Sequence, residues 1–283
     1  MSDPRRRRSL PSRMARHRAA LGGLAVVIVV VLAAALAPWI APYDPGIQDL
    51  DAGLSGPSAR HWLGQDRLGR DILSRMLYGA RVSVAVGFGT VSLSLVIGLL
   101  VGSASGFFGG RVDRFCMRLV DVLLAFPGIL LAIAITSVLG PSFRNVFLAL
   151  CALGWTAFAR LIRGQVLKVR EMEFVQSARA AGTPPGRLLL RHILPNAMTP
   201  VLVEATFGVA RAIVAEAGLS FLGLGVQPPA PSWGAMINEG RHFLFVAPHL
   251  TTVPGLAIMA TVMAVNFLGD GLRDAMDVRD ELP

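Results

Sequence analysis

Residues 173–196, EFVQSARAAGTPPGRLLLRHILPN, decide the fold because they interrupt an otherwise apolar chain with a compact basic element. The stretch is too polar to cross a bilayer, which takes roughly 20 predominantly apolar residues. Helical spacing on both sides of the central GTPP predicts a helix–turn–helix that stays outside the hydrocarbon. We expect a membrane protein with such an element to present it to a soluble partner. The alternative is a solvated amphipathic loop on the membrane surface.

The local chemistry predicts how this helix–turn–helix is built. Gly182 suits the position just past a helix end, where a left-handed backbone is required. We expect Thr183 to cap the second helix and Pro184 to occupy its first position, where a missing N–H costs nothing. The second helix should reach about Leu194, and Pro195 should mark its end or a kink into the next span. The first helix carries a stripe of small residues that would let another surface approach closely: Val175, Ala178 and Ala181.

The composition predicts an all-α integral membrane protein. Hydrophobic residues make up 53% of the chain and charged residues 16%, and the mean hydropathy is +0.58. We expect six spans, with the helix–turn–helix between the fourth and the fifth, and no separate soluble domain. The expected spans are residues 21–41, 82–106, 119–140, 145–162, 198–221 and 250–269.

The positive charge predicts the orientation. Six spans place most cations on one side, and the positive-inside rule makes that side, with both termini, cytoplasmic. The net charge of +9 does not indicate nucleic-acid binding, because the basic residues are not interleaved with aromatic ones on a soluble face. The cations on this side are Arg5–Arg8, Arg13, Arg16, Arg18, Arg111, Arg114, Arg118, Arg160, Arg163, Lys168, Arg170, Arg179, Arg187 and Arg191.

The chain divides into five segments by these patterns. A basic tail, residues 1–20, precedes the first span, which we expect to be an uncleaved signal anchor. Residues 42–81 should lie outside the cytoplasm and include an amphipathic helix at the membrane interface, with apolar residues at helical spacing at Leu68, Ile72 and Met76. Residues 82–272 form the core, with the polar loop at about 164–197, and residues 273–283 form a cytoplasmic tail.

Glycine and proline give two predictions within the spans. Gly98, Gly102 and Gly106 form a small-residue ridge in the second span, for close helix packing within the subunit or against a partner. Pro127 predicts a kink in the third span. Near the start of that span, we expect Asp121 to form a local ion pair with Arg118.

The fifth span carries three charged residues, Glu204, Arg211 and Glu216. A charge at mid-membrane costs about 2.5–3.5 kcal/mol on insertion scales, so these residues should face protein or water. One interpretation is that they line a translocation path and meet the charged ends of a peptide-like substrate. The other is a structural ion pair inside the bundle.

No catalytic, metal or nucleotide site is predicted. The sequence contains no GxxxxGK[ST], HExxH or GxSxG pattern, so any energy from ATP must come from a partner. Cys116 and Cys151 lack motif spacing and are expected to be small packing residues.

The polar loop resembles the EAA loop of bacterial ABC-importer permeases, whose pattern is EAA, three residues, Gly, nine residues, Ile, any residue, Leu-Pro. Three positions depart from it, since Gln176 and Ser177 replace Glu and Ala, and His192 stands in place of Ile. The resemblance implies a coupling helix that fits a groove on a cytoplasmic ATPase. The positions it covers are Gln176, Ser177, Ala178, Ala181, Gly182, Leu194 and Pro195, with Arg187 and Arg191 as docking charges.

Four longer blocks resemble the dipeptide/oligopeptide/nickel permease family, and within it the second permease subunit. They are HWLGQDRLGRDILSRMLYGARVSV (61–84), GFFGGRVDRFCMRLVDVLLAFPGILLA (106–132), GLSFLGLGVQPPAPSWGAMI (218–237) and NFLGDGLRDAMDVR (266–279).

This resemblance implies a type I ABC-importer permease in a bacterial inner membrane. Its partners would be a homologous permease, two ATP-binding subunits that use ATP and Mg, and an extracytoplasmic binding protein. This chain would bind no cofactor itself. The implied cargo is a di- or oligopeptide, with nickel complexes or glutathione as alternatives. A passive channel, a scaffold or an intramembrane enzyme are more remote alternatives.

Overall fold

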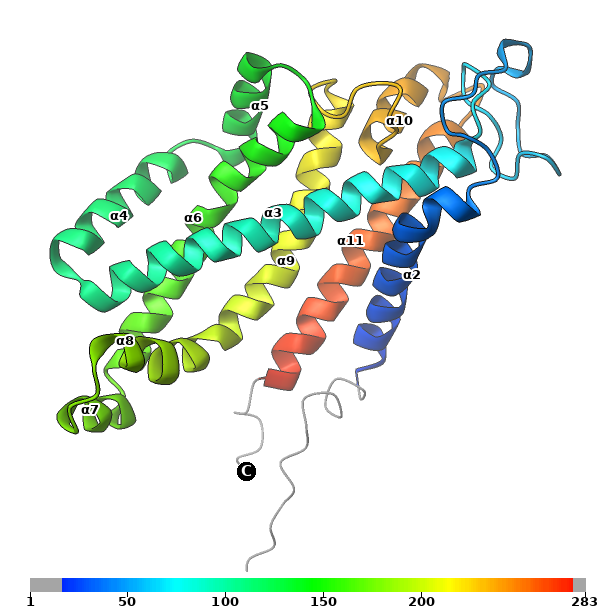
Figure 1. Ribbon diagram of the computed structural model, residues 1–283. Coiled ribbons are helices and arrows are strands. Elements are labelled where there is room, and N and C mark those ends of the chain that lie inside the picture. Colours follow the sequence, from blue (N-terminus) through cyan, green and yellow to red (C-terminus); the bar gives the residue numbers. More distant parts are fainter. Residues whose placement is uncertain (1–16, 277–283) are drawn as a thin grey trace, which may run out of the picture.

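The computed structural model describes residues 17–276, and this part of the chain consists of helices joined by loops (Figure 1). Most of the two expected tails, residues 1–20 and 273–283, therefore lies outside the described residues. The elements are α2 (Arg18–Ile40), η1 (Leu50–Ala52), α3 (Ile72–Phe108), α4 (Gly110–Leu124), α5 (Gly128–Leu139), α6 (Phe143–Arg170), α7 (Glu173–Ala180), α8 (Pro185–Arg187), the π-helical turn η2 (Leu188–Ile193), α9 (Leu194–Phe221), α10 (Trp233–Gly240), η3 (Arg241–Phe243) and α11 (His249–Met276).

The described residues contain five helical runs that could span a membrane, or six if one bent pair of helices is counted as a span. Five helical runs are long and apolar enough to cross a membrane, namely α2, α3, α6, the continuous run Pro185–Phe221 and α11. The bent pair is α4–α5, whose two helices meet at an angle of 82°, the geometry of a broken span or a re-entrant loop. We expected residues 119–140 to form a single kinked span, and that expectation was wrong. Pro127 explains the break, because it has a ψ of 120° and cannot continue α4.

The second span also begins earlier than expected. No separate amphipathic helix forms within residues 42–81; instead, α3 starts at Ile72 and runs unbroken to Phe108. Asp71 caps this helix, because its carboxylate accepts a hydrogen bond from the Ser74 N–H at 2.7 Å. Ile72 and Met76 therefore belong to the first turns of the span, and Leu68 lies in the loop before it.

The glycine ridge packs α3 against α6 within the subunit. A Cβ atom added at Gly98 would lie 2.4 Å from the Phe158 Cβ, and one at Gly102 would lie 2.5 Å from the Ala159 carbonyl oxygen. The two helices run in the same direction, since Gly106 in turn faces Arg163 and Val166. The predicted close approach is confirmed, and its partner is α6.

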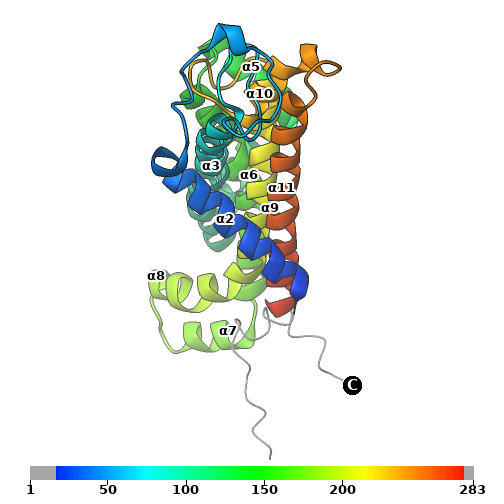
Figure 2. The same ribbon diagram turned by 90° about the vertical axis from the view of Figure 1, so that its right-hand side faces the viewer.

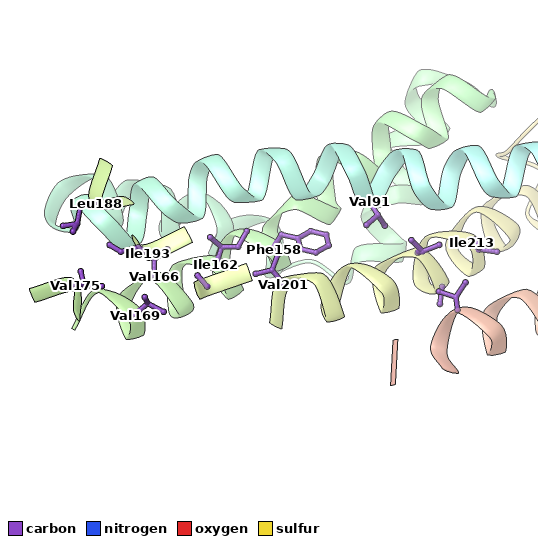
Figure 3. Packing of buried hydrophobic residues seen from close by; sticks show 14 residues of the cluster. Val91, Phe158, Ile162, Val166, Val169, Val175, Leu188, Ile193, Val201 and Ile213 are labelled. Carbon is purple, nitrogen blue, oxygen red and sulfur yellow. The ribbon is translucent and has the colours of Figure 1, made fainter. Parts of the chain in front are cut away.

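The largest apolar core runs along α3, α6 and α9 and reaches into the polar loop (Figure 3). Val175 of α7 and Leu188 of η2 are buried at one end of this cluster, while Val91 and Ile213 lie toward the other. The loop helices are therefore anchored to the bundle by apolar packing and do not hang free from it.

The two ends of the bundle carry different structures. Figure 2 shows α7 and α8 across one end, which we call the α7 end, while α5, α10 and the loop of residues 41–71 lie at the other, the α10 end. The described residues begin and end near the α7 end (Figure 1).

Candidate functional site

The turn after α7 has the geometry predicted for Gly182. Its φ is +80°, in the left-handed region. The Gly182 N–H donates to the Arg179 carbonyl at 3.0 Å, and the Thr183 N–H donates to the Ala178 carbonyl at 3.1 Å. This pair of bonds is the Schellman arrangement that satisfies the last carbonyls of a helix. The reversal of the chain after α7 therefore depends on a glycine backbone.

The second half of the loop is built differently from the prediction. Thr183 does not cap the next helix, because Pro184 is the N-cap residue and Pro185 occupies the first turn. Pro195 does not end the helix, which continues from Pro185 to Phe221, but the run changes direction between α8, which lies across the end of the bundle, and α9, which runs along it (Figure 2). The π turn at Leu188–Ile193, in which the Leu194 N–H donates to the Leu189 carbonyl, widens the helix just before Pro195. Pro195 then lies in the first turn of α9, where its missing N–H is tolerated.

The exposed face of the loop is not the small-residue stripe. Val175 is buried and Ala178 is half-buried against the core, so these two side chains face the bundle. Two apolar side chains that the sequence reasoning passed over face outward: Leu190, which is 65% exposed, and Phe174. Of the positions predicted for docking, Gln176 and Leu194 are half-buried, and the exposed ones are Ser177, Ala181, Gly182, Arg187, Arg191 and Pro195.

Polar contacts tie this loop to α3. The Gln176 Nε2 donates to the Arg170 carbonyl at 3.0 Å, and the Arg170 Nη1 donates to the Gly106 carbonyl at 2.9 Å. Gln176, which departs from the EAA pattern, therefore bonds to the backbone at the C-terminal end of α6. No sequence signal indicated this contact, because Gly106 and Arg170 are 64 positions apart.

Two acidic residues of α4 pair with α6. Asp113 accepts from Arg163 Nη2 at 2.7 Å and from Ser105 Oγ at 2.5 Å, which joins α3, α4 and α6. Asp121 pairs with Arg160 at 2.6 Å and not with Arg118, so the expected local pair was wrong. The broken span turns Asp121 toward α6, a relation that neighbours in the sequence do not reveal.

The structure separates the three charged residues of the fifth span. The Arg211 Nη2 forms an ion pair with the Glu204 Oε1, and the two side chains are 59% and 31% exposed. Glu216 is fully buried, and its Oε1 accepts a hydrogen bond from Ser220 Oγ at 2.6 Å. Among the described residues, Glu216 has no ion-pair partner. Glu204 and Arg211 therefore form a pair, and Glu216 lies apart from them.

A cavity of about 490 Å³ lies between α3, α5, α6, α9 and the end of α4, and Arg211 is the charged residue in its wall. Its size results from small side chains in the wall, including Gly128, Gly154, Gly208 and Ala212. Hydroxyl groups come from Thr90, Ser94 and Thr156, and the rest of the lining is apolar: Val91, Leu124, Ile129, Ala132, Leu150, Leu153, Ala157, Phe158 and Ala215.

Two exposed ion pairs flank this cavity. Arg160 and Asp121 are 54% and 63% exposed, and they lie one helical turn from the lining residues Ala157 and Leu124. Glu204, the partner of Arg211, lies one turn before the lining residue Gly208. Charges exposed on membrane-spanning helices do not face lipid tails. This face of the bundle is therefore covered by water or by protein.

A second polar cluster, which the sequence reasoning missed, lies at the α10 end. Arg70 pairs with Asp66 at 2.6 Å and with Glu239 at 2.5 Å, while Arg75 pairs with the same two carboxylates at 3.4 and 3.1 Å. We call these four residues the charge quartet. The quartet fixes the start of α3 to α10. The sequence signal that could have indicated it is the high density of charged residues in 66–75.

Comparisons with known proteins agree with this architecture. The family model described as "Binding-protein-dependent transport system inner membrane component" matches residues 94–279, and "N-terminal TM domain of oligopeptide transport permease C" matches residues 11–57. The chain is 48% identical over 266 residues to the "Glutathione transport system permease protein GsiD" of Escherichia coli O1:K1, covering 94% of this chain and 88% of that one. It is 45% identical over 262 residues to the protein of that name from Pectobacterium atrosepticum, covering 92% and 87%.

A solved structure shows the same fold. A chain from "Inward facing conformations of the MetNI methionine ABC transporter" matches with a TM-score of 0.57 and 19% identity, covering 69% of this chain and 93% of that chain. The architecture is that of a type I ABC-importer permease. The relatives are transport permeases and not enzymes, so ATP hydrolysis belongs to partner subunits. From the family match and the identity to curated relatives, the chain belongs to the binding-protein-dependent transport system inner membrane components, as a multi-pass ABC-importer permease of the peptide, oligopeptide and glutathione family.

Proposed function

We propose that this chain forms half of the translocation path of an ATP-driven importer of small peptides, and that a homologous permease forms the other half. The observation that carries the proposal is the cavity beside Arg211, on the face that also bears the Arg160–Asp121 pair. Its volume of about 490 Å³ lies within the roughly 300–1,000 Å³ of small-molecule sites. Exposed charges on spanning helices are compatible with a second subunit and a hydrated path at this face.

The proposed orientation places the α7 end in the cytoplasm. This end carries the basic residues of α4, α6 and the loop, as the positive-inside rule requires. The N- and C-termini are then cytoplasmic as well. The α10 end, which the charge quartet holds together, faces outward and receives the binding protein.

The proposed contact with an ATP-binding subunit is the exposed face of α7, α8 and η2. It combines the apolar side chains of Phe174 and Leu190 with the cations Arg187 and Arg191, and Gly182 sets the turn between the two helices. A central apolar anchor with surrounding charge is the usual composition of an interface. In this proposal the ATPase subunits, and not this chain, bind ATP and Mg.

The cargo we favour is a peptide of two or three residues. The relatives' names include glutathione transport, and glutathione is itself a tripeptide with carboxylate groups. Nickel complexes remain the alternative cargo. Among residues 17–276, no three His, Cys, Asp or Glu side chains converge as metal ligands, so nothing in the described residues favours them.

The first test is purification of the complex from its native membrane, followed by reconstitution in liposomes. We expect an ATPase and a second permease to copurify, and the liposomes to take up dipeptides, tripeptides or glutathione only with ATP and the binding protein. Purification of this chain alone, under conditions that preserve other membrane complexes, would reject the proposal.

A pair of matched variants tests the docking face. We expect Leu190→Asp to abolish copurification of the ATPase, because it buries a charge in an apolar anchor. Val246→Asp is the control, since Val246 is also exposed and apolar but lies at the α10 end. Equal copurification of the ATPase with both variants would show that η2 is not the docking face.

A further inference from the structure

Arg211 combines a position in the cavity wall with unused hydrogen-bonding capacity. Its ion pair with Glu204 uses one nitrogen, Nη2, and one carboxylate oxygen. A guanidinium has five N–H donors in a planar fork that fits a carboxylate with two parallel hydrogen bonds. In the part of the chain that the structure describes, Arg211 has no other hydrogen-bond partner. Most of its donors are therefore free for a ligand in the cavity.

The other polar groups of the cavity wall compete little with Arg211 for a ligand. The Thr90 hydroxyl donates to the Val86 carbonyl at 2.5 Å, and the Thr156 hydroxyl donates to the Leu153 carbonyl at 2.7 Å. Both protons are thus committed to backbone groups of their own helices. A solute in this cavity meets one cation, hydroxyl oxygens and otherwise apolar surface.

Glu204 is placed to compete with such a solute. It lies one turn before Gly208 on α9, outside the cavity lining and on the side of the α7 end. A carboxylate entering from the α10 end reaches Arg211 without passing Glu204. A carboxylate leaving toward the α7 end passes Glu204, which can pair with Arg211 again.

From this geometry we propose that Arg211 binds a carboxylate group of the transported solute, and that Glu204 is its partner when the cavity is empty. The translocation step then selects small solutes that carry a carboxylate, in addition to any selection by the binding protein. This inference rests on the proposed function, and it assigns Arg211 as a specificity-determining residue.

The test compares trialanine with trialanine amide as substrates of the complete transporter in liposomes. The uptake rate is measured with a saturating concentration of substrate-loaded binding protein and is divided by the ATPase rate. We expect Arg211→Gln to lower uptake of the free acid per ATP by about tenfold or more, because a charge-assisted hydrogen bond is lost. Uptake of the amide per ATP should change little. Because the binding protein is the same in both assays, a changed preference belongs to the permease.

Arg160→Gln is the matched control, since Arg160 is an equally exposed arginine on the same face but is not part of the cavity wall. It should leave the preference for the acid unchanged. If Arg211→Gln does not assemble, the Glu204→Gln/Arg211→Gln variant removes both charges together and is assayed in the same way.

Loss of acid preference in the Arg211 variants alone would support the proposal. Wild-type acid uptake per ATP in a folded Arg211→Gln or double variant would overturn it. The failure of the proposed function is a different result, in which the wild-type transporter imports no peptide with ATP.

Discussion

The charge quartet at the α10 end and the Glu204–Arg211 pair beside the cavity use the same chemistry in opposite settings. The quartet balances two arginines with two carboxylates and buries both guanidinium groups. The pair beside the cavity joins two residues of one helix through a single oxygen and leaves Arg211 more than half exposed. A buried network with its charges balanced holds elements together, whereas an exposed and partly satisfied cation remains available for a ligand.

The largest effect on stability is expected from Arg75→Met in the quartet. Removing one partner leaves uncompensated carboxylates in a buried site, and such losses cost about 3–5 kcal/mol. Thermal unfolding in detergent should show a clear drop in Tm. Arg67→Met is the control, because Arg67 is an exposed arginine in the same loop and has no ion pair among the described residues. Similar midpoints for the two variants would mean that the quartet does not hold α3 to α10.

An intermediate effect is expected from Asp113→Asn. This carboxylate is about four-fifths buried and accepts hydrogen bonds from Arg163 and Ser105. Hydrogen bonds to charged groups contribute about 1.5–3 kcal/mol each, so we expect a loss of that order in the free energy of unfolding. The same unfolding measurement with Glu171→Gln, whose side chain is largely exposed, gives the baseline. A loss no larger than that baseline would contradict the role of Asp113 in joining three helices.

The Glu204→Gln/Arg211→Gln variant should separate stability from transport. An exposed ion pair contributes about 0–1 kcal/mol, so its Tm should stay close to that of the wild type. Uptake of a peptide with a free carboxylate should nevertheless be strongly reduced, because the cavity loses its cation. A large drop in Tm, together with normal uptake by the protein that remains folded, would show that this pair stabilises the fold and does not bind the solute.

The smallest effect is expected from Asp121→Asn/Arg160→Gln. Both side chains are more than half exposed, so the change in unfolding free energy should again be about 0–1 kcal/mol. Peptide uptake should also stay near the wild-type rate, since neither residue lines the cavity. Loss of uptake without loss of stability would show that the translocation path extends beyond the cavity to the Arg160–Asp121 pair.

Hydropathy located five of the spans, because a bilayer requires a long apolar helix wherever the chain crosses it, but it missed the early start of α3 and the break between α4 and α5. Gly182 and the glycine ridge were also predictable, since each depends on a local backbone or packing requirement. The break at Pro127 could be placed by sequence, but its angle of 82° depends on what α4 and α5 pack against.

The candidate site was only partly predictable. Arg211 attracted attention because a charge in a span is costly, but the small side chains around it come from four helices. Glu216 looked similar in sequence and proved to be buried away from the pair. The charge quartet was missed because Arg70 and Glu239 are 169 positions apart, and no local pattern links them.

The continuous helical run Pro185–Phe221 has a mechanical consequence. It carries Arg187 in α8, which lies across the α7 end, and Arg211 well along α9, which runs along the bundle (Figure 2). The two arginines are thus joined by one continuous helical run, with no loop between them. A force applied at Arg187 would therefore reach Arg211 through this one helical run, by way of the π turn at Leu188–Ile193.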